Sequence, residues 1–158
     1  MMTISARLAE PSDIPALCDL YRELETEMVA LKPIWRIADG LPEPIAAAFG
    51  LAVASPTSGV VIGELDGVPL SFLLWRDTDL LPQADGVLVG VIELIFTSEP
   101  ARQVGLGEAV IGRFLDDAST REISLFDAVV PPGHRFAKNF FESNGFKARR
   151  IVMHRDGS

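Results

Sequence analysis

The sequence predicts one mixed α/β (α+β) domain that spans residues 1–158. Apolar residues recur with a period of about 2 in some segments and about 3.6 in others, which are the periods of strands and helices. Turn signals separate these segments at short intervals. The predicted order is strand, helix, helix, three strands, helix, strand, helix, strand, and 158 residues suit a single core.

The first segments are a short strand and two helices. Residues Thr3–Leu8 are expected to form the strand. Ser12 is a suitable N-cap for the following helix, and Asp13 places a negative charge at its positive end. Residues Pro44–Ala54 form the second predicted helix. The buried face of the first helix follows from apolar residues at steps of three and four, namely Ile14, Leu17, Tyr21, Leu24 and Met28.

A β-hairpin and a long apolar strand follow. Gly59–Glu64 and Val68–Trp75 flank the pair Asp66-Gly67, a strong turn signal between apolar runs. Val87–Thr97 is rich in Val, Ile and Leu and predicts the central strand.

The remaining predicted elements alternate helix and strand. They are, in order, an amphipathic helix Leu106–Ala118, a strand Ile123–Val130, a breaker Pro131-Pro132-Gly133, a helix His134–Ser143, a left-handed turn at Asn144-Gly145 and a closing strand Ala148–Arg155.

The most informative segment joins the central strand to the next helix. Arg102, Gly105 and Gly107 form an R-x-x-G-x-G pattern there. Glycines allow a ligand to approach the backbone, and the first helical turn offers free N–H groups to an anion such as a pyrophosphate. The pattern alone also fits a purely structural turn. A dinucleotide fingerprint would require a third glycine at Val110, and the Gly-Lys-Ser/Thr of a P-loop is absent.

This segment resembles the acyl-CoA motif of the GNAT superfamily of N-acetyltransferases, Q/R-x-x-G-x-G/A. Further segments resemble that family in the same order along the chain, namely Ala6–Leu17, Val60–Leu70 and Phe136–Phe146. The resemblance implies a mostly antiparallel sheet flanked by helices and splayed between its central strand and the next to admit CoA.

The resemblance also implies an enzyme. We expect transfer of an acetyl or other short acyl group from acetyl-CoA to a primary amine, by direct attack in a ternary complex. A non-catalytic module that binds or senses acyl-CoA is the alternative. The residues expected to bind the cofactor are Ile95, Phe96, Thr97, Arg102, Gln103, Val104, Gly105, Leu106, Gly107, His134, Ala137 and Phe141.

Two residues are candidates for proton transfer. Glu93 interrupts an apolar run and would share a face with Ile95 and Thr97 by strand alternation, so it could act as a base, directly or through water. A hydrogen-bonded strand residue is the alternative. His134 is the weaker candidate, because an imidazole can transfer protons, and the favoured alternative is that it caps the helix that follows it and contacts the cofactor.

The general acid is not predicted. Phe141 stands where the family usually has a tyrosine, and phenylalanine cannot donate a proton. Tyr21 fits the buried face of the first helix, with a place in the active-site wall as the alternative. Cys18 cannot form an intrachain disulfide, because it has no second cysteine to pair with, and is expected to be a small buried residue.

Charge and composition restrict the partners. A net charge of −8 disfavours broad nucleic-acid binding, and no segment is apolar enough to span a membrane. Without a signal peptide, a cytoplasmic protein is expected. No metal is expected. Acids outnumber bases eight to four in residues 1–50, whereas residues 134–155 hold six bases and one acid. The resemblance implies that the acceptor lies near the first two helices, so their acidic character favours a small, cationic amine. Acceptor identity, acyl chain length and a homodimer stay open.

Overall fold

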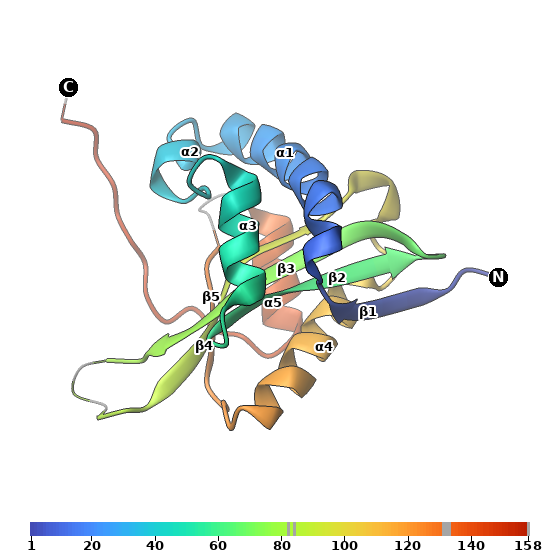
Figure 1. Cartoon of the computed structure of the whole chain (residues 1–158). Helices are drawn as coiled ribbons and strands as arrows, with labels where there is room; N and C mark the ends of the chain where they lie inside the picture. Colours follow the sequence, from blue (N-terminus) through green and yellow to red (C-terminus); the bar gives the residue numbers. More distant parts are fainter. Residues whose placement is uncertain (82, 84, 131–133, 158) are drawn as a thin grey trace.

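A computed structural model describes residues 1–81, 83, 85–130 and 134–157. Its centre is a five-stranded sheet in the order β1-β2-β3-β4-β5 (Figure 1). The strands are β1 (Ile4–Leu8), β2 (Ser58–Leu65), β3 (Val68–Asp79), β4 (Leu88–Thr97) and β5 (Phe126–Ala128). The first four pair antiparallel and β5 pairs parallel with β4, so the expected mixed, mostly antiparallel sheet is confirmed.

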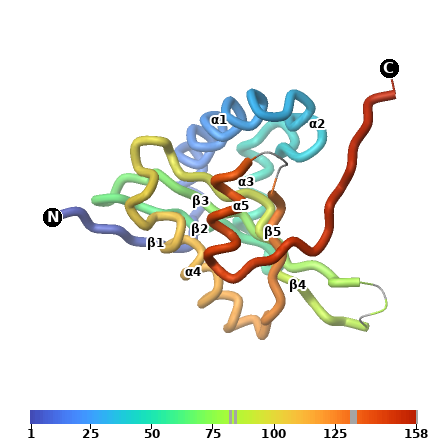
Figure 2. The backbone as a smooth tube through the Cα atoms, turned by 180° about the vertical axis from the view of Figure 1, so that it is seen from behind, coloured from blue at the N-terminus to red at the C-terminus, as the bar shows by residue number. Residues whose placement is uncertain are grey.

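Helices cover both faces of this sheet. The helices α1, α2 and α3 lie on one face, and α4 and α5 lie on the other (Figures 1 and 2). Their bounds are α1 Ile14–Leu31, α2 Trp35–Ala38, α3 Ile45–Ala54, α4 Leu106–Thr120 and α5 Arg135–Ser143. Short 3₁₀ turns, η1 (Pro11–Asp13) and η3 (Glu99–Ala101), precede α1 and follow β4. None of the described helices is both long and apolar enough to cross a membrane.

Two apolar cores lie on opposite faces of the sheet. Alternation along β3 sends Phe72 into the core beneath α1 and α3, and it sends the next residue, Leu73, into the core beneath α4. The first core contains an edge-to-face contact between Phe49 and Phe72, with ring centroids 5.7 Å apart. Because the middle of β3 is buried on both sides, its sequence is a nearly continuous apolar run.

The start of α1 differs from the prediction. Ser12 does not cap α1, because it lies inside the 3₁₀ turn η1. The N-cap residue of α1 is Asp13, and its side chain makes no capping hydrogen bond to the helix. Asp13 instead accepts a hydrogen bond from the N–H of Glu10 at 2.7 Å and pairs with Arg7 at 2.8 Å. The hydrogen bonds from Arg7 lower the pKa of Asp13, so its carboxylate stays charged while it ties β1 to α1.

The hairpin prediction is confirmed. Asp66 and Gly67 both adopt positive φ angles, 51° and 81°, as a two-residue turn with the twist of the flanking strands requires. The return strand is longer than expected, since β3 continues to Asp79.

The closing strand predicted at Ala148–Arg155 is wrong. Residues 146–157 form no strand, and the predicted strand Ile123–Val130 is reduced to the three residues of β5. A strand needs a neighbouring strand edge, and the segment leaves the edge of β5 soon after Arg149, which pairs with Asp127. The breaker Pro131-Pro132-Gly133 lies outside the described residues.

Two glycines provide a test of this packing. A Cβ atom at Gly63 of β2 would lie 2.8 Å from Val110 Cγ1 and 3.0 Å from Ser71 Cβ, whereas a Cβ at Gly112 of α4 would meet nothing within 4 Å. We expect Gly63→Ala to lower the free energy of unfolding by about 1–3 kcal/mol through overpacking. Gly112→Ala should raise it by about 0.5–1 kcal/mol through helix propensity. Urea unfolding measures both, and equal effects would contradict the assigned packing.

Candidate functional site

A β-bulge in β4 reorients the second half of the strand. Trp75 pairs with Ile92 while the preceding residue, Leu74, pairs with Leu94, so Glu93 is an extra residue. Ile92 therefore packs beneath α4, and Leu94 packs on the opposite face beneath α1 and α3. In a regular strand, two residues at this spacing would share a face.

The bulge also turns backbone groups toward an open edge. The N–H of Ser98 donates to the carbonyl of Leu70 at 2.8 Å, so after the bulge every second residue, including Phe96, bonds to β3. The N–H and C=O groups of Ile95 and Thr97 point the other way. The ladder with β5 ends where Val129 donates to Ile92 at 3.1 Å, and beyond it no described residue makes a backbone hydrogen bond to this edge of β4. The carbonyl of Thr97 accepts a side-chain hydrogen bond from Arg102 Nε at 2.9 Å. The resemblance to the GNAT superfamily implied a gap at this place, between the central strand and the next, and admission of CoA there stays a prediction.

Glu93 lies on a different face from the one expected. Its carboxylate is 3.0 Å from Arg76 Nε. Trp75 packs beneath α4, so the next residue along β3, Arg76, lies on the α1 face. The expectation that Glu93 shares a face with Ile95 and Thr97 is wrong, because the bulge breaks the alternation between them. The side chain is 34% exposed, so solvent reaches the carboxylate. Its role as a base stays a prediction.

The loop before α4 presents unpaired backbone donors. Gln103 and Gly105 adopt positive φ angles of 67° and 98°, and Gly105 is the N-cap of α4. The first backbone hydrogen bond of the helix runs from Ala109 N–H to the carbonyl of Gly105 at 3.0 Å. Within the described part of the chain, the N–H groups of residues 105–108 have no acceptor. Such a turn, at the positive end of a 15-residue helix, attracts an anion.

The two glycines of the motif, Gly105 and Gly107, are required for different physical reasons. Gly105 is suited to its left-handed φ, and a Cβ there would meet only Ile4 Cδ1 at 3.5 Å. A Cβ at Gly107 would lie 2.9 Å from Cε1 of Phe140, because α5 packs against the first turn of α4. Sequence reasoning did not single out Phe140, although it stands next to Phe141 in the family-like segment.

The side chain of Arg102 points toward α1. Its Nη2 donates to Glu27 Oε2 at 2.7 Å and its Nε donates to the carbonyl of Thr97 at 2.9 Å. Nearby, Ser98 Oγ donates to Glu23 Oε1 at 2.8 Å. We call these three contacts the Arg102 latch. The sequence analysis missed Glu23 and Glu27, whose spacing of four residues on α1 places them on one face.

The ends of α5 are both capped. His134 Nδ1 accepts a hydrogen bond from the N–H of Ala137 at 3.1 Å, which confirms the capping interpretation. At the other end, Phe146 N–H bonds to the carbonyl of Phe141 at 3.0 Å beside a left-handed Gly145. Phe141 is 3% exposed and its ring lies 5.2 Å from that of Phe146, so it forms part of the core beneath α4 and α5.

Tyr21 belongs to the core beneath α1 and α3, and Cys18 packs against that core. Tyr21 is buried, and its hydroxyl accepts a hydrogen bond from the N–H of Leu41 at 2.8 Å. Burial raises the pKa values of both the Tyr21 hydroxyl and the Cys18 thiol. Both groups are therefore held in their protonated forms near neutral pH.

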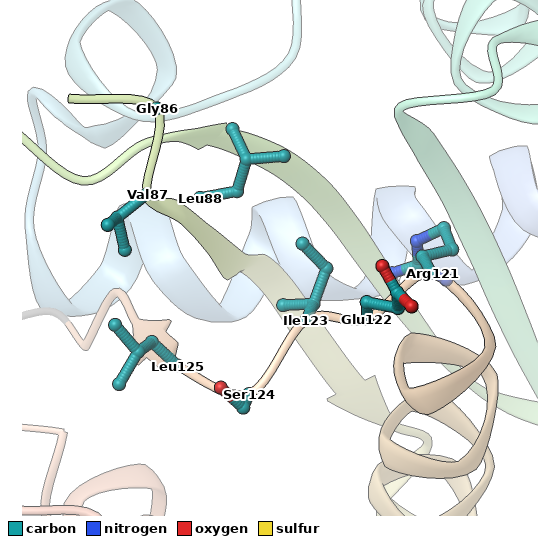
Figure 3. A pocket seen from close by; sticks show the side chains of 8 residues that line it. All are labelled: Gly86, Val87, Leu88, Arg121, Glu122, Ile123, Ser124 and Leu125. Carbon is teal, nitrogen blue, oxygen red and sulfur yellow. The ribbon is translucent and has the colours of Figure 1, made fainter.

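Two surface hollows lie away from the loop before α4. One, of about 300 Å³, is lined by residues 86–88 and 121–125 (Figure 3). The other, of about 220 Å³, contains Trp75, Asp117 and Arg121. Neither includes a residue predicted to bind CoA. In the described residues, no three His, Cys, Asp or Glu side chains gather as metal ligands would.

Comparison with known proteins finds similarity in structure alone. No family model and no curated protein matches the sequence. The aminoglycoside N-acetyltransferase AAC(6')-Iy in complex with CoA superposes with a TM-score of 0.75 at 17% identity, over 100% of this chain and 97% of that chain. A ribosomal-protein-alanine N-acetyltransferase from Brucella melitensis biovar Abortus 2308 gives 0.71 at 18% identity, over 98% and 100%.

A third structure agrees with these two. A tetramutant of the BH1408 protein from Bacillus halodurans gives a TM-score of 0.80 at 18% identity, over 96% of this chain and 98% of that chain. The similarity covers the sheet and the helices on both of its faces in all three cases. The chain therefore has the fold of the GNAT N-acetyltransferases.

Proposed function

We propose that the protein transfers an acetyl or other short acyl group from acyl-CoA to a primary amine. The observation that carries the proposal is the loop before α4, with its unpaired N–H groups beside an edge of β4 that no described strand covers. A pyrophosphate fits the first and a pantetheine amide fits the second. The solved AAC(6')-Iy complexes support this proposal, because that protein binds CoA and a bisubstrate analogue within the same fold.

The cofactor would lie along the splayed edge. Backbone N–H groups of residues 103–107 would bind the pyrophosphate, and Ile95, Phe96 and Thr97 would line the pantetheine arm. His134 and Ala137 would form the opposite wall, whereas the ring of Phe141, which was also expected to contact the cofactor, is buried in the core. The side chain of Arg102 supports the loop through the latch in this arrangement, and the backbone provides the phosphate donors.

Direct acyl transfer would require few catalytic side chains. The amine nitrogen attacks the thioester carbonyl carbon, the C–S bond breaks, and CoA leaves as a thiolate. Holding both substrates together supplies much of the acceleration, and a free N–H of β4 can stabilise the developing oxyanion. Glu93 would accept the ammonium proton through water, from the α1 side of the sheet. The thiolate can take its proton from solvent, since Phe141 has none to give.

The acceptor is proposed to be a small amine, which is itself cationic near neutral pH. The acids of residues 1–50 provide less free negative charge than their number implies. Glu25 pairs with Arg22 at 3.0 Å, Glu27 pairs with Arg102 at 2.7 Å, and Asp39 pairs with Lys32 at 2.8 Å. Shape and hydrogen bonding would therefore select the acceptor more than long-range attraction would.

Calorimetric titration with acetyl-CoA, followed by a free-thiol assay over a panel of amines, tests the proposal. Saturable binding and amine-dependent release of CoA are expected. Absence of binding at millimolar acetyl-CoA would exclude the proposal. Binding without release of CoA for any amine would favour the alternative, a module that senses acyl-CoA. The specific observation behind that alternative is Phe141, which is buried and lacks a hydroxyl.

Gly105→Glu should abolish CoA binding. The substitution places a carboxylate beside the pyrophosphate donors, and we expect at least a hundredfold loss of affinity, about 2.7 kcal/mol. Gly86→Glu is the matched control, since Gly86 also has a positive φ, 83°, and open space around its Cβ, but precedes β4 at the opposite end of the strand. Calorimetry should find wild-type CoA affinity in the control. Equal affinity in both variants would refute the location of the phosphate site.

The latch makes Glu27 a test of the role of Arg102. If Arg102 positions the loop, Glu27→Gln and Arg102→Gln should weaken CoA binding to a similar extent, and the double variant should be little worse than either. If Arg102 binds phosphate directly, Glu27→Gln should leave the affinity unchanged or raise it. Glu10→Gln, an exposed acid outside the latch, is the control. Titration calorimetry of the four variants and the wild-type protein distinguishes the two roles.

A further inference from the structure

Arg76 and Glu93 form an ion pair that leaves several of its hydrogen-bonding groups open. Arg76 Nε donates to Glu93 Oε1 at 3.0 Å. Among the described residues, the two Nη groups of Arg76 donate to no acceptor, and Glu93 Oε2 accepts no hydrogen bond. Arg121 shows the contrast, since its Nε and both of its Nη groups donate to aspartates. The Arg76–Glu93 pair therefore presents a free guanidinium fork beside a free carboxylate oxygen.

The pair lies where the open edge of β4 begins. Val129 donates to Ile92 at the end of the ladder with β5, and Glu93 is the next residue along β4. Arg76 and Glu93 lie on the α1 face, toward the end of the sheet where β3 and β4 extend beyond α3 (Figure 1). Their side chains are 49% and 34% exposed, so a molecule from solvent can reach both. An acceptor bound here would lie beside the edge proposed to hold the pantetheine arm.

A second ion pair on the same surface is already saturated. Asp127 of β5 lies on the α1 face, because the residues before and after it pack beneath α4. Both of its carboxylate oxygens accept hydrogen bonds from Arg149. Of these two pairs, the one formed by Arg76 and Glu93 is therefore the one with groups free to bind a charged ligand.

The charge of the Arg76–Glu93 pair favours a zwitterion over a simple amine. Its net charge is zero, so an ammonium attracted by Glu93 is repelled by the adjacent guanidinium. A free amino acid carries an ammonium and a carboxylate on one carbon atom. Its ammonium can meet Glu93 Oε2 while its carboxylate meets the fork of Arg76, the geometry in which arginine binds carboxylates with two hydrogen bonds. Exposed ion pairs contribute little to stability, so the pair can accept such a ligand at little cost to the fold.

We propose that the acceptor is a free amino acid whose carboxylate is bound by Arg76. This inference rests on the proposed acyl transfer and names its acceptor. Glu93 takes one proton from the ammonium, directly or through water. The nitrogen lone pair then forms a C–N bond with the thioester carbonyl carbon, and the C–S bond breaks with its electron pair on sulfur. The nitrogen loses a second proton to solvent, the thiolate takes one from solvent, and the product is an N-acyl amino acid.

Matched pairs of acceptors test the role of the carboxylate. Each pair is an amino acid and its primary amide, which keeps the amine and the side chain but lacks the negative charge. The free-thiol assay gives kcat/KM for both. For the amino acid that reacts best, we expect a preference over its amide of at least about tenfold, the size expected for hydrogen bonds to a charged group. The amine of the amide loses its proton more easily, so amine reactivity alone would favour the amide.

Variants of Arg76 assign this preference to its guanidinium. Arg76→Gln should reduce the preference to about twofold or less, mainly by raising KM for the amino acid. Arg76→Lys, which keeps the charge but not the fork, should retain part of it. Arg113→Gln is the control, because Arg113 is an exposed arginine on α4, on the opposite face of the sheet. The control should keep the wild-type preference.

The failure of this inference is distinguishable from that of the proposed function. Amides or simple amines used as well as amino acids would overturn the inference and leave acyl transfer standing, as would an unchanged preference in Arg76→Gln. Absence of CoA release with every amine and amino acid would overturn both. Calorimetry should find wild-type affinity for acetyl-CoA in Arg76→Gln. A loss of that affinity would also overturn the inference, because it would assign Arg76 to the fold or to the cofactor site.

Discussion

The extra residue in β4 is the constraint on which the rest of the site depends. A strand in the middle of a sheet normally bonds to both neighbours in alternation, and β4 does so with β3 and β5 as far as Ile92. Glu93 shifts this alternation by one residue. The groups that would have faced β3 at Ile95 and Thr97 then face outward, at the level where β5 has already ended. The inserted residue therefore decides which backbone groups face the open edge, those of Ile95 and Thr97 in place of those of Leu94 and Phe96.

The Arg102 latch adds rigidity where the bulge alone would leave a loose strand end. Two helical carboxylates on α1 meet a hydroxyl and a guanidinium on the loop after β4, at 2.8 Å and 2.7 Å. These contacts are partly exposed, so each is worth little alone. Together with the bond from Arg102 to the carbonyl of Thr97 they fix one loop against one helix. The face of α1 and the entrance of α4 are thereby linked.

Local signals in the sequence were sufficient for most of the fold. The Asp66-Gly67 turn and the apolar periodicity of α1 and α4 depend on neighbours in the chain, and both were predictable. The side of Glu93 was not, because a bulge is defined only by the register with β3. The contact of the Arg102 side chain was also not predictable, since its partner Glu27 is 75 residues away in the sequence. The missing last strand was not predictable either, because a strand forms only against a neighbouring strand, and the segment 146–157 leaves β5 after the contact of Arg149 with Asp127.

The contact between Gly107 and Phe140 has an evolutionary consequence. The ring of Phe140 occupies the space that any side chain at position 107 would need, since a Cβ there would lie 2.9 Å from it. The two positions therefore cannot vary independently. In relatives that carry alanine at the position of Gly107, the residue at the position of Phe140 should be smaller or α5 should sit farther from α4. An alignment of such relatives would show this as covariation between a glycine of the loop and an aromatic residue 33 positions later.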